Sequence, residues 1–405
     1  QDGEARYQVG DGNRLPLGES TLEEPEDVRA LTTTLDSNLQ WYAQNSLAAR
    51  MKEVGAKSGT VVVMDAKNGN LLSVASYPTF NPNTDIGKKG AKLGNVAFSE
   101  VFEPGSTSKI MTIAAALAEG TVPVIIPNRL KRYDASFKDS HDHPTLYRTV
   151  AGTLAESSNI GTVLVSETMT SKTLETYFRK FGLGQRSGTG YPGESGGLLA
   201  KSEDWSGTQS KTVSFGQGLS VTAIQAASVF QTIANDGVRV APRLVESLTA
   251  ADGTVTPTPK SASTRVVSAQ TANDVSKMLE GVVSDEGTAE QAMIPGYRVA
   301  GKTGTAEYFD AAAGRYSGRT ASFIGYAPAD DPQIIVAVIV HKPIQPFFGG
   351  PVAGPVFKDV ATYALQELKI PPTGAKPAEI TIKVSPEEAL ADPTLLRDGR
   401  KRSAG

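Results

Sequence analysis

The spacing of apolar positions divides the chain into strands, then helices, then strands again. After Asp36, which is a typical helix N-cap residue, apolar side chains recur at helical spacing from residue 39 to residue 51. Residues 60–64 and 71–75 are apolar runs of strand length on either side of Asn68-Gly69-Asn70. This arrangement predicts a helix followed by a β-hairpin.

Between residues 109 and 279 the pattern is mainly helical, with helices predicted to end at Gly120, Gly182 and Gly237. Strands return at residues 297–303, 321–326 and 334–341, and a last helix is predicted at residues 356–368. Strands at both ends of a helical segment predict an α+β fold, in which distant segments complete one sheet.

Composition excludes several classes of function. The 405 residues carry a formal net charge of -3, so no strong field favours nucleic acid or an anionic membrane surface. Cysteine is absent, which excludes disulfides, thiolate metal sites and cysteine nucleophiles. Only three histidines are present, so few residues could act as a histidine base.

The two ends of the chain differ from the middle. Residues 1–34 mix charges with glycine and proline, and are predicted to form short strands and loops of an accessory domain. The tail after Pro371 is rich in proline and charge, which predicts a flexible extension. No run approaches the roughly 20 apolar residues of a membrane span. We therefore expect a soluble chain, with any anchor upstream of Gln1.

The first candidate motif is Ser106-Thr107-Ser108-Lys109, here called the SxxK motif. It follows Pro104-Gly105, which predicts a tight turn, and helical periodicity begins directly after it. Ser106 would then lie at a helix N-terminus with Lys109 one turn on, and a desolvated lysine can activate a serine hydroxyl. A capping serine followed by a surface lysine explains the motif equally well on its own.

Two further motifs follow in the sequence. Ser157-Ser158-Asn159, the SxN motif, supplies a hydroxyl for proton relay and an amide, although it could simply cap the next helix. Lys302-Thr303-Gly304-Thr305, the KTGT motif, combines a lysine and hydroxyls suited to a carboxylate with a glycine that permits close backbone approach. It could also be an ordinary strand end.

The combination decides between these interpretations, because S-x-x-K, a serine-containing triplet and K-T-G in this order are a known set. Together with residues 77–83, 191–194, 214–218 and 348–357, they make the chain resemble the transpeptidase domain of a class B, monofunctional penicillin-binding protein. Residues 348–357 are most similar to the septal, cell-division subgroup.

The resemblance implies an antiparallel sheet flanked by helices, as in penicillin-binding proteins and serine β-lactamases. Residues 1–55 would be the end of an N-terminal pedestal domain with its connecting helix, residues 56–370 the transpeptidase domain, and residues 371–405 a C-terminal extension. The family is anchored in the membrane and acts at the extracytoplasmic face, which implies an ectodomain whose anchor is missing from this chain.

The resemblance also implies roles for the motif residues. Ser106 would be acylated, Lys109 would activate it, and Ser157 with Asn159 would relay protons and position substrate. In the KTGT motif, Lys302 and Thr303 would support the proton network and bind a carboxylate, with Gly304 and Thr305 beside the substrate.

The implied activity is a peptidoglycan D,D-transpeptidase that β-lactams acylate at the same serine. Its partners would be D-Ala-D-Ala stem peptides, β-lactams, a glycosyltransferase and other divisome proteins, with no nucleic acid and no cofactor. Two alternatives remain open from the residues. One is a serine β-lactamase or D,D-carboxypeptidase, and the other is a non-catalytic β-lactam sensor or divisome scaffold.

Metal sites are not favoured by the sequence. His141-Asp142-His143 lacks a supporting cluster and is interpreted as a surface loop or cleft edge. Asp65, Asn68 and Asn70 lack the glycine spacing and distal glutamate of a calcium loop, so a turn is the better interpretation. Gly216-Gln217-Gly218 lacks the lysine and spacing of a phosphate-binding loop.

Overall fold

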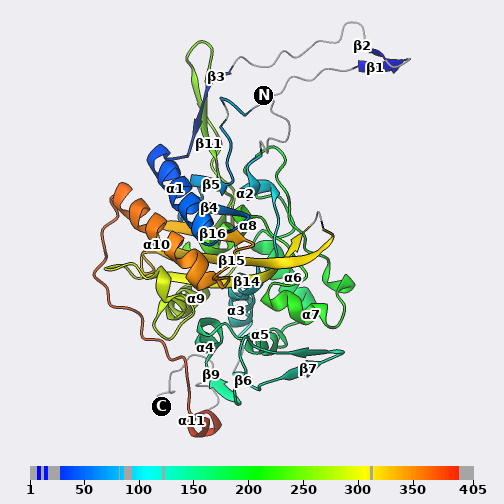
Figure 1. Ribbon diagram of the computed structural model, residues 1–405, viewed down its shortest axis with the longest axis vertical. Helices are drawn as coiled ribbons and strands as arrows, with labels where there is room; N and C mark the ends of the chain where they lie inside the picture. The colour runs from blue at the N-terminus through cyan, green and yellow to red at the C-terminus, as the bar shows by residue number, and fades with distance from the viewer. Residues whose placement is uncertain are drawn as a thin grey trace.

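Figure 1 presents the computed structural model, which describes residues 7–10, 13–16, 28–81, 83–85, 94–120, 124–310 and 313–391. Most of the predicted N-terminal accessory segment and the last part of the predicted C-terminal extension lie outside the described residues.

A five-stranded antiparallel sheet forms the centre of the molecule, in the order β14-β15-β16-β4-β5. Its strands are β4 (Ser58–Asp65), β5 (Leu71–Tyr77), β14 (Ala300–Asp310), β15 (Arg315–Ala327) and β16 (Ile334–His341). β16 pairs with β4 along its whole length, which joins the N-terminal hairpin to strands almost 300 positions later in the sequence. The prediction that distant segments complete one sheet is confirmed.

Helices cover both faces of this sheet, so its middle strands are apolar on both sides. β16 is buried at every position, which explains its continuous apolar run. α1 (Ser37–Glu53) and α10 (Gly349–Glu367) pack together on one face, where Tyr42 stacks on Tyr363. α8 (Ala223–Ala234) and α9 (Ala269–Glu280) pack on the opposite face.

The sequence pattern placed α1 correctly. The Asp36 side chain accepts a hydrogen bond from the backbone N–H of Leu39, as expected of an N-cap. Leu39, Ala43, Leu47 and Met51 are buried at every fourth position, so one stripe of the helix contacts the sheet.

The helical part of the chain lies below the sheet in Figure 1. Its centre is α3 (Lys109–Ala118), which packs against α5, α6 and α9 and is buried from Lys109 to Ala116. The other helices in the described residues are α2 (Val96–Ser99), α4 (Val150–Ala155), α5 (Asn159–Ser166), α6 (Ser171–Lys180), α7 (Gln209–Thr212) and α11 (Pro386–Ala391).

The remaining strands of the described residues are short and lie outside the central sheet. β12-β11-β3 form a small sheet that projects beyond α1, and the others form two-stranded antiparallel sheets. Their bounds are β1 (Tyr7–Gly10), β2 (Asn13–Pro16), β3 (Val28–Thr33), β6 (Val124–Ile126), β7 (Leu130–Arg132), β8 (Ala135–Phe137), β9 (Leu146–Arg148), β10 (Val238–Val240), β11 (Val245–Ala250), β12 (Val255–Pro257) and β13 (Ser263–Arg265).

Two sequence expectations differ from the structure. α10 begins at Gly349, seven residues before the predicted start at residue 356, because packing overrides the poor helix propensity of its glycines and prolines. The tail after Pro371 was expected to be a free extension, which is wrong for residues 380–384. Ile382 is only 9% exposed, and the backbone of this segment bonds to the segment before α4.

Candidate active site

Ser106 lies in a tight turn that leads directly into a buried helix. The 3₁₀ turn η1 (Gly105–Ser108) continues into α3, as the sequence predicted. Thr107 Oγ1 donates to the Pro104 carbonyl at 2.8 Å, and Ser108 Oγ donates to the Gly105 carbonyl at 2.9 Å. These bonds fix the turn, so Ser106 reaches a cavity wall while Lys109 points into the interior.

Gly216, the first of two glycines in the segment 214–218, packs against this turn. Gly216 has φ of 87°, and its carbonyl accepts a hydrogen bond from Gly105 N–H at 3.0 Å. A Cβ at Gly216 would overlap the Gly105 backbone and the Ser108 hydroxyl. Gly216 is therefore required for close packing rather than for binding phosphate.

Lys109 is fully buried and bonded to the SxN motif. Its Nζ donates to Asn159 Oδ1 at 2.8 Å, to the Ser157 carbonyl at 2.5 Å and to Ser157 Oγ at 3.4 Å. Burial lowers the pKa of Lys109 from 10.5 to about 7, although the carboxylate of Asp139 acts in the opposite direction. Near neutral pH this amine can therefore both accept and donate a proton.

The SxN motif both caps a helix and faces the site, so the two interpretations left open by the sequence are compatible. Ser158 is the N-cap of α5 and accepts from Gly161 N–H at 2.8 Å. Ser157 has φ of 61°, a left-handed conformation that is strained for serine and turns it toward Lys109. Asn159 is the first helical residue and directs its amide oxygen to the same lysine.

The KTGT motif lies on β14, which packs directly against η1. A Cβ at Gly304 would overlap Ser322 Oγ and would lie 3.1 Å from the Pro104 carbonyl, so glycine allows β14 to approach the turn. Thr303 Oγ1 is 2.8 Å from Thr288 Oγ1, and Thr305 Oγ1 accepts from Gly349 N–H at 3.1 Å.

Lys302 is also fully buried, but its contacts are weak. Its Nζ lies 3.4 Å from the Thr303 carbonyl and 3.3 Å from Thr303 Oγ1. Burial, together with the positive charge of Lys109, lowers the pKa of Lys302 well below its usual value. The two lysines therefore sit close enough to influence each other.

A cavity of about 810 Å³ brings the three motifs together. Ser106, Ser157, Asn159, Thr303 and Thr305 line it, and the two buried lysines lie behind this lining. Aromatic and charged side chains complete the walls: Phe137, Phe215, Phe347, Phe348, Lys138, His141, Glu156, Glu307 and Arg319. Apolar walls with a few convergent polar groups are typical of ligand sites.

Asp139 is a site residue that sequence reasoning missed. Its carboxylate accepts from Ser158 Oγ at 2.7 Å, from Asn159 N–H at 2.6 Å and from Ile160 N–H at 3.0 Å. Asp139 thus binds the first turn of α5, and its negative charge raises the pKa of Lys109. Asp139 lies 19 to 21 positions before the three residues that donate to it, so no local sequence pattern indicates this role.

The loop that contains His141, Asp142 and His143 lies at one edge of this cavity. His141 lines the cavity, and His143 Nε2 lies 3.2 Å from Asp139 Oδ2. Asp142 points elsewhere and pairs with Arg129 at 2.7 Å. Within the described residues, no group of three or more His, Cys, Asp or Glu side chains could hold a metal ion.

The sequence profile of the "Penicillin binding protein transpeptidase domain" matches residues 59–362. The chain belongs to the class B penicillin-binding proteins. It falls in the septal subgroup, so this resemblance and the predicted fold, an antiparallel sheet flanked by helices, are confirmed.

Relatives in several bacteria resemble this class B chain along most of its length. It is 37% identical over 386 residues to "Penicillin-binding protein PbpB" of Mycolicibacterium smegmatis, covering 91% of this chain and 60% of the relative. It is 33% identical to "Peptidoglycan D,D-transpeptidase FtsI" of Escherichia coli, covering 84% of this chain and 57% of the relative.

The crystal structure of penicillin-binding protein 3 from Mycobacterium tuberculosis, complexed with ampicillin, superposes with a TM-score of 0.83 at 36% identity. It covers 88% of this chain and 82% of that one. The chain spans about 60% of the length of the first curated relative. No helix in the described part of the chain is both long and apolar enough to cross a membrane.

Proposed function

We propose that the chain is a peptidoglycan D,D-transpeptidase that works through an acyl-enzyme on Ser106. The observation that carries this proposal is the state of Lys109: one turn from Ser106, fully buried, with a pKa of about 7. A serine hydroxyl needs a base close to its reacting position, and this amine exchanges protons at neutral pH.

The first step forms the acyl-enzyme. Neutral Lys109 takes the hydroxyl proton as Ser106 Oγ attacks the carbonyl carbon of the D-Ala-D-Ala amide. Backbone N–H groups of Ser106 and Thr305 stabilise the resulting oxyanion. The C–N bond then breaks, and the proton returns through Lys109 and Ser157 to the departing D-alanine amine.

The second step forms the cross-link. The amine of a neighbouring stem peptide attacks the ester carbon, gives up one proton through the same Ser157–Lys109 relay and releases Ser106 with its hydroxyl restored. Asn159 orients Lys109 and the substrate amide. Lys302 and Thr303 bind the terminal carboxylate beside Gly304 and Thr305 on the edge strand β14, where β-lactam carboxylates would bind as well.

We propose that this reaction takes place at the extracytoplasmic face of the membrane during septal wall synthesis, beside a glycosyltransferase and other divisome proteins. Membership of the septal subgroup supports this assignment. Residues 1–55 are then the end of a pedestal domain with its connecting helix, residues 56–370 the transpeptidase domain and residues 371–405 an extension.

Labelling with a fluorescent penicillin tests the proposal. The wild-type chain should form one covalent adduct, detected as fluorescence on a denaturing gel and as a mass increase, whereas Ser106→Ala should form none. Ser99→Ala is the matched control, because the Ser99 side chain is exposed and does not line the cavity. Undiminished labelling of Ser106→Ala would overturn the assignment of the nucleophile.

A time course separates the alternatives. A transpeptidase keeps the adduct for minutes to hours, whereas a β-lactamase loses it within seconds and accumulates hydrolysed penicillin. Cross-linking of a D-Ala-D-Ala donor to an acceptor amine, followed by mass spectrometry, distinguishes a transpeptidase from a sensor, which would be acylated but form no product. Release by water alone would indicate a carboxypeptidase.

A further inference from the structure

The chain after α10 runs down one side of the molecule, at the left in Figure 1, and contacts the segments that lead into two of the motifs. It descends from the end of α10 to α11 (Figure 1). Residues 377–384, here called the strap, run beside β9. Lys383 forms an antiparallel bridge with Arg148, and Val384 N–H donates to the Tyr147 carbonyl at 3.3 Å. The strap thus adds one isolated β-bridge to the β6–β9 pair.

The first anchor of the strap is the N-terminus of α4. The buried Thr149 caps this helix by accepting from Gly152 N–H at 2.9 Å. The same hydroxyl donates to the Thr381 carbonyl at 2.6 Å, and Thr149 N–H donates to the Ile382 carbonyl at 3.3 Å. A Cβ at Gly152 would overlap that carbonyl oxygen. α4 ends at Ala155, two residues before Ser157, so the strap is bonded to the helix that leads into the SxN motif.

The second anchor is η4 (Gly281–Val283) and the residues that follow it. Ile380 packs over Gly281, and Lys383 Nζ lies 2.8 Å from Glu286. Both charged side chains are more than half exposed, so this ion pair contributes little. Two positions after Glu286, Thr288 forms its hydroxyl contact with Thr303 of the KTGT motif.

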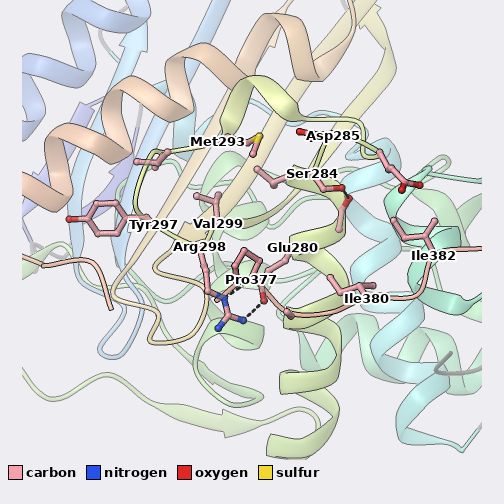
Figure 2. Close-up of a pocket in the computed structure, with 15 residues that line it drawn as sticks. Glu280, Ser284, Asp285, Met293, Tyr297, Arg298, Val299, Pro377, Ile380 and Ile382 are labelled. Atoms are coloured by element: carbon pink, nitrogen blue, oxygen red, sulfur yellow. Dashed lines mark hydrogen bonds and ion pairs between the residues drawn. The ribbon is translucent and has the colours of Figure 1, made fainter. Parts of the chain in front are cut away.

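A cavity of about 450 Å³ lies between the strap and the body. Figure 2 shows residues that line it: Pro377, Ile380 and Ile382 belong to the strap, and Glu280, Ser284, Met293, Tyr297 and Val299 belong to the body. Arg298 pairs with Glu280 at 2.8 and 2.7 Å across this space, immediately before β14 begins. The strap is therefore held at its anchors and not by close packing along its length.

We propose that the strap is a positioning element for acylation: by bonding to α4 and contacting η4, it sets the distance between the SxN and KTGT motifs. This inference rests on the proposed function. Ser157 and Thr303 both line the cavity, and a displacement of about 1 Å in such a site can reduce the rate about 100-fold.

Gly152→Ala tests the first anchor, because the added methyl displaces the Ile382 carbonyl while alanine favours the helix itself. We expect the first-order rate constant for acylation by saturating penicillin to fall about tenfold. Gly281→Ala is the matched control. Its added Cβ would have ordinary contacts of 3.6 to 3.8 Å, and the rate constant should not change.

Thr149 offers a conservative rescue. Thr149→Val removes both hydroxyl hydrogen bonds and should slow acylation, whereas Thr149→Ser retains both and should restore the wild-type rate constant.

Truncation tests the strap as a whole. A chain ending at Gly374 lacks the strap and should acylate more slowly than the full-length Thr149→Val and Thr149→Ser variants. A chain ending at Ala391 retains the strap and should match wild type.

The rate constant separates positioning from folding, because it is independent of the fraction of protein that is folded. If Gly152→Ala and the chain ending at Gly374 melt at lower temperature but acylate at the wild-type rate constant, the strap is only structural and the inference is wrong. If the wild-type chain itself forms no adduct, the proposed function fails instead.

Discussion

The start of α3 and the start of β14 each bury one lysine behind the lining of the same cavity, yet the surroundings of the two amines differ. Lys109 donates to oxygens of Ser157 and Asn159, with Asn159 Oδ1 at 2.8 Å, and lies in the field of Asp139. Among the described residues, the hydrogen-bond contacts of Lys302 Nζ are with Thr303, at 3.3 and 3.4 Å, and the charge of Lys109 repels it.

Compensation of the buried charge explains the difference. Burial disfavours the ammonium form of both residues, but hydrogen-bond acceptors and a carboxylate offset part of that penalty at Lys109 alone. The pKa of Lys109, about 7, therefore permits proton exchange near neutral pH. Within the described residues no carboxylate pairs with Lys302, so a substrate carboxylate bound beside it would act against burial and the charge of Lys109 and raise the pKa of Lys302.

Removing the amine of Lys109 should have the largest effect. Lys109→Met preserves volume but removes the base, and general-base catalysis contributes about 10²- to 10⁴-fold. We expect acylation to fall by that factor while the folded state persists, as measured by stopped-flow acylation and thermal melting.

Lys109→Arg is the matched comparison, because arginine retains a charge but does not release its proton. It should be as inactive as Lys109→Met. Substantial acylation by Lys109→Arg would mean that positive charge, and not proton exchange, is the function of this residue.

Changing Lys302 should have a smaller effect, confined to recognition of the carboxylate. A hydrogen bond to a charged group contributes about 1.5–3 kcal/mol, so Lys302→Met should weaken penicillin binding about 10- to 100-fold. The first-order acylation rate constant should change less than the dissociation constant. Removing an uncompensated buried amine should also raise the melting temperature.

A penicillin methyl ester completes this test as a double-mutant cycle. Wild type should prefer the free acid over the ester by the same factor that Lys302→Met loses, whereas the variant should discriminate little between them. An undiminished preference in Lys302→Met would assign carboxylate recognition to other residues.

The smallest effect should come from removing the negative charge of Asp139, which acts on Lys109. Acylation by wild type should rise with pH through about 7, as Lys109 loses its proton, and should fall about tenfold per pH unit below that midpoint. The carboxylate raises the pKa of Lys109, so Asp139→Asn should move the midpoint to lower pH. The plateau rate should fall several-fold because Ser158 and Asn159 lose a charged acceptor.

Asp142→Asn is the control for this pH profile. Asp142 belongs to the same loop, but its side chain is 76% exposed and pairs with Arg129. Its removal should leave the midpoint unchanged. Equal shifts in the two variants would show that general loop charge, and not the contact of Asp139 with the SxN motif, sets the pKa of Lys109.

Much of the fold followed from local pattern. The Asp36 cap with buried residues at every fourth position indicated α1, and the turn at Pro104-Gly105 indicated the start of the α3 region. The three motifs could be found from residue type and order alone. The start of α10 could not, because Gly349 and Gly350 are poor helix formers whose position depends on contacts with Gly304 and Thr288.

By itself, the sequence determined which chemistry is available: a serine one turn before a lysine, a second serine with an asparagine, and a lysine on a strand. Only the tertiary structure decided how these groups behave. Burial and the partners at Ser157, Asn159 and Asp139 set the pKa of Lys109, and the strap reaches α4 from residues over 220 positions later. Desolvation and contacts between distant segments depend on packing in three dimensions, which local sequence does not specify.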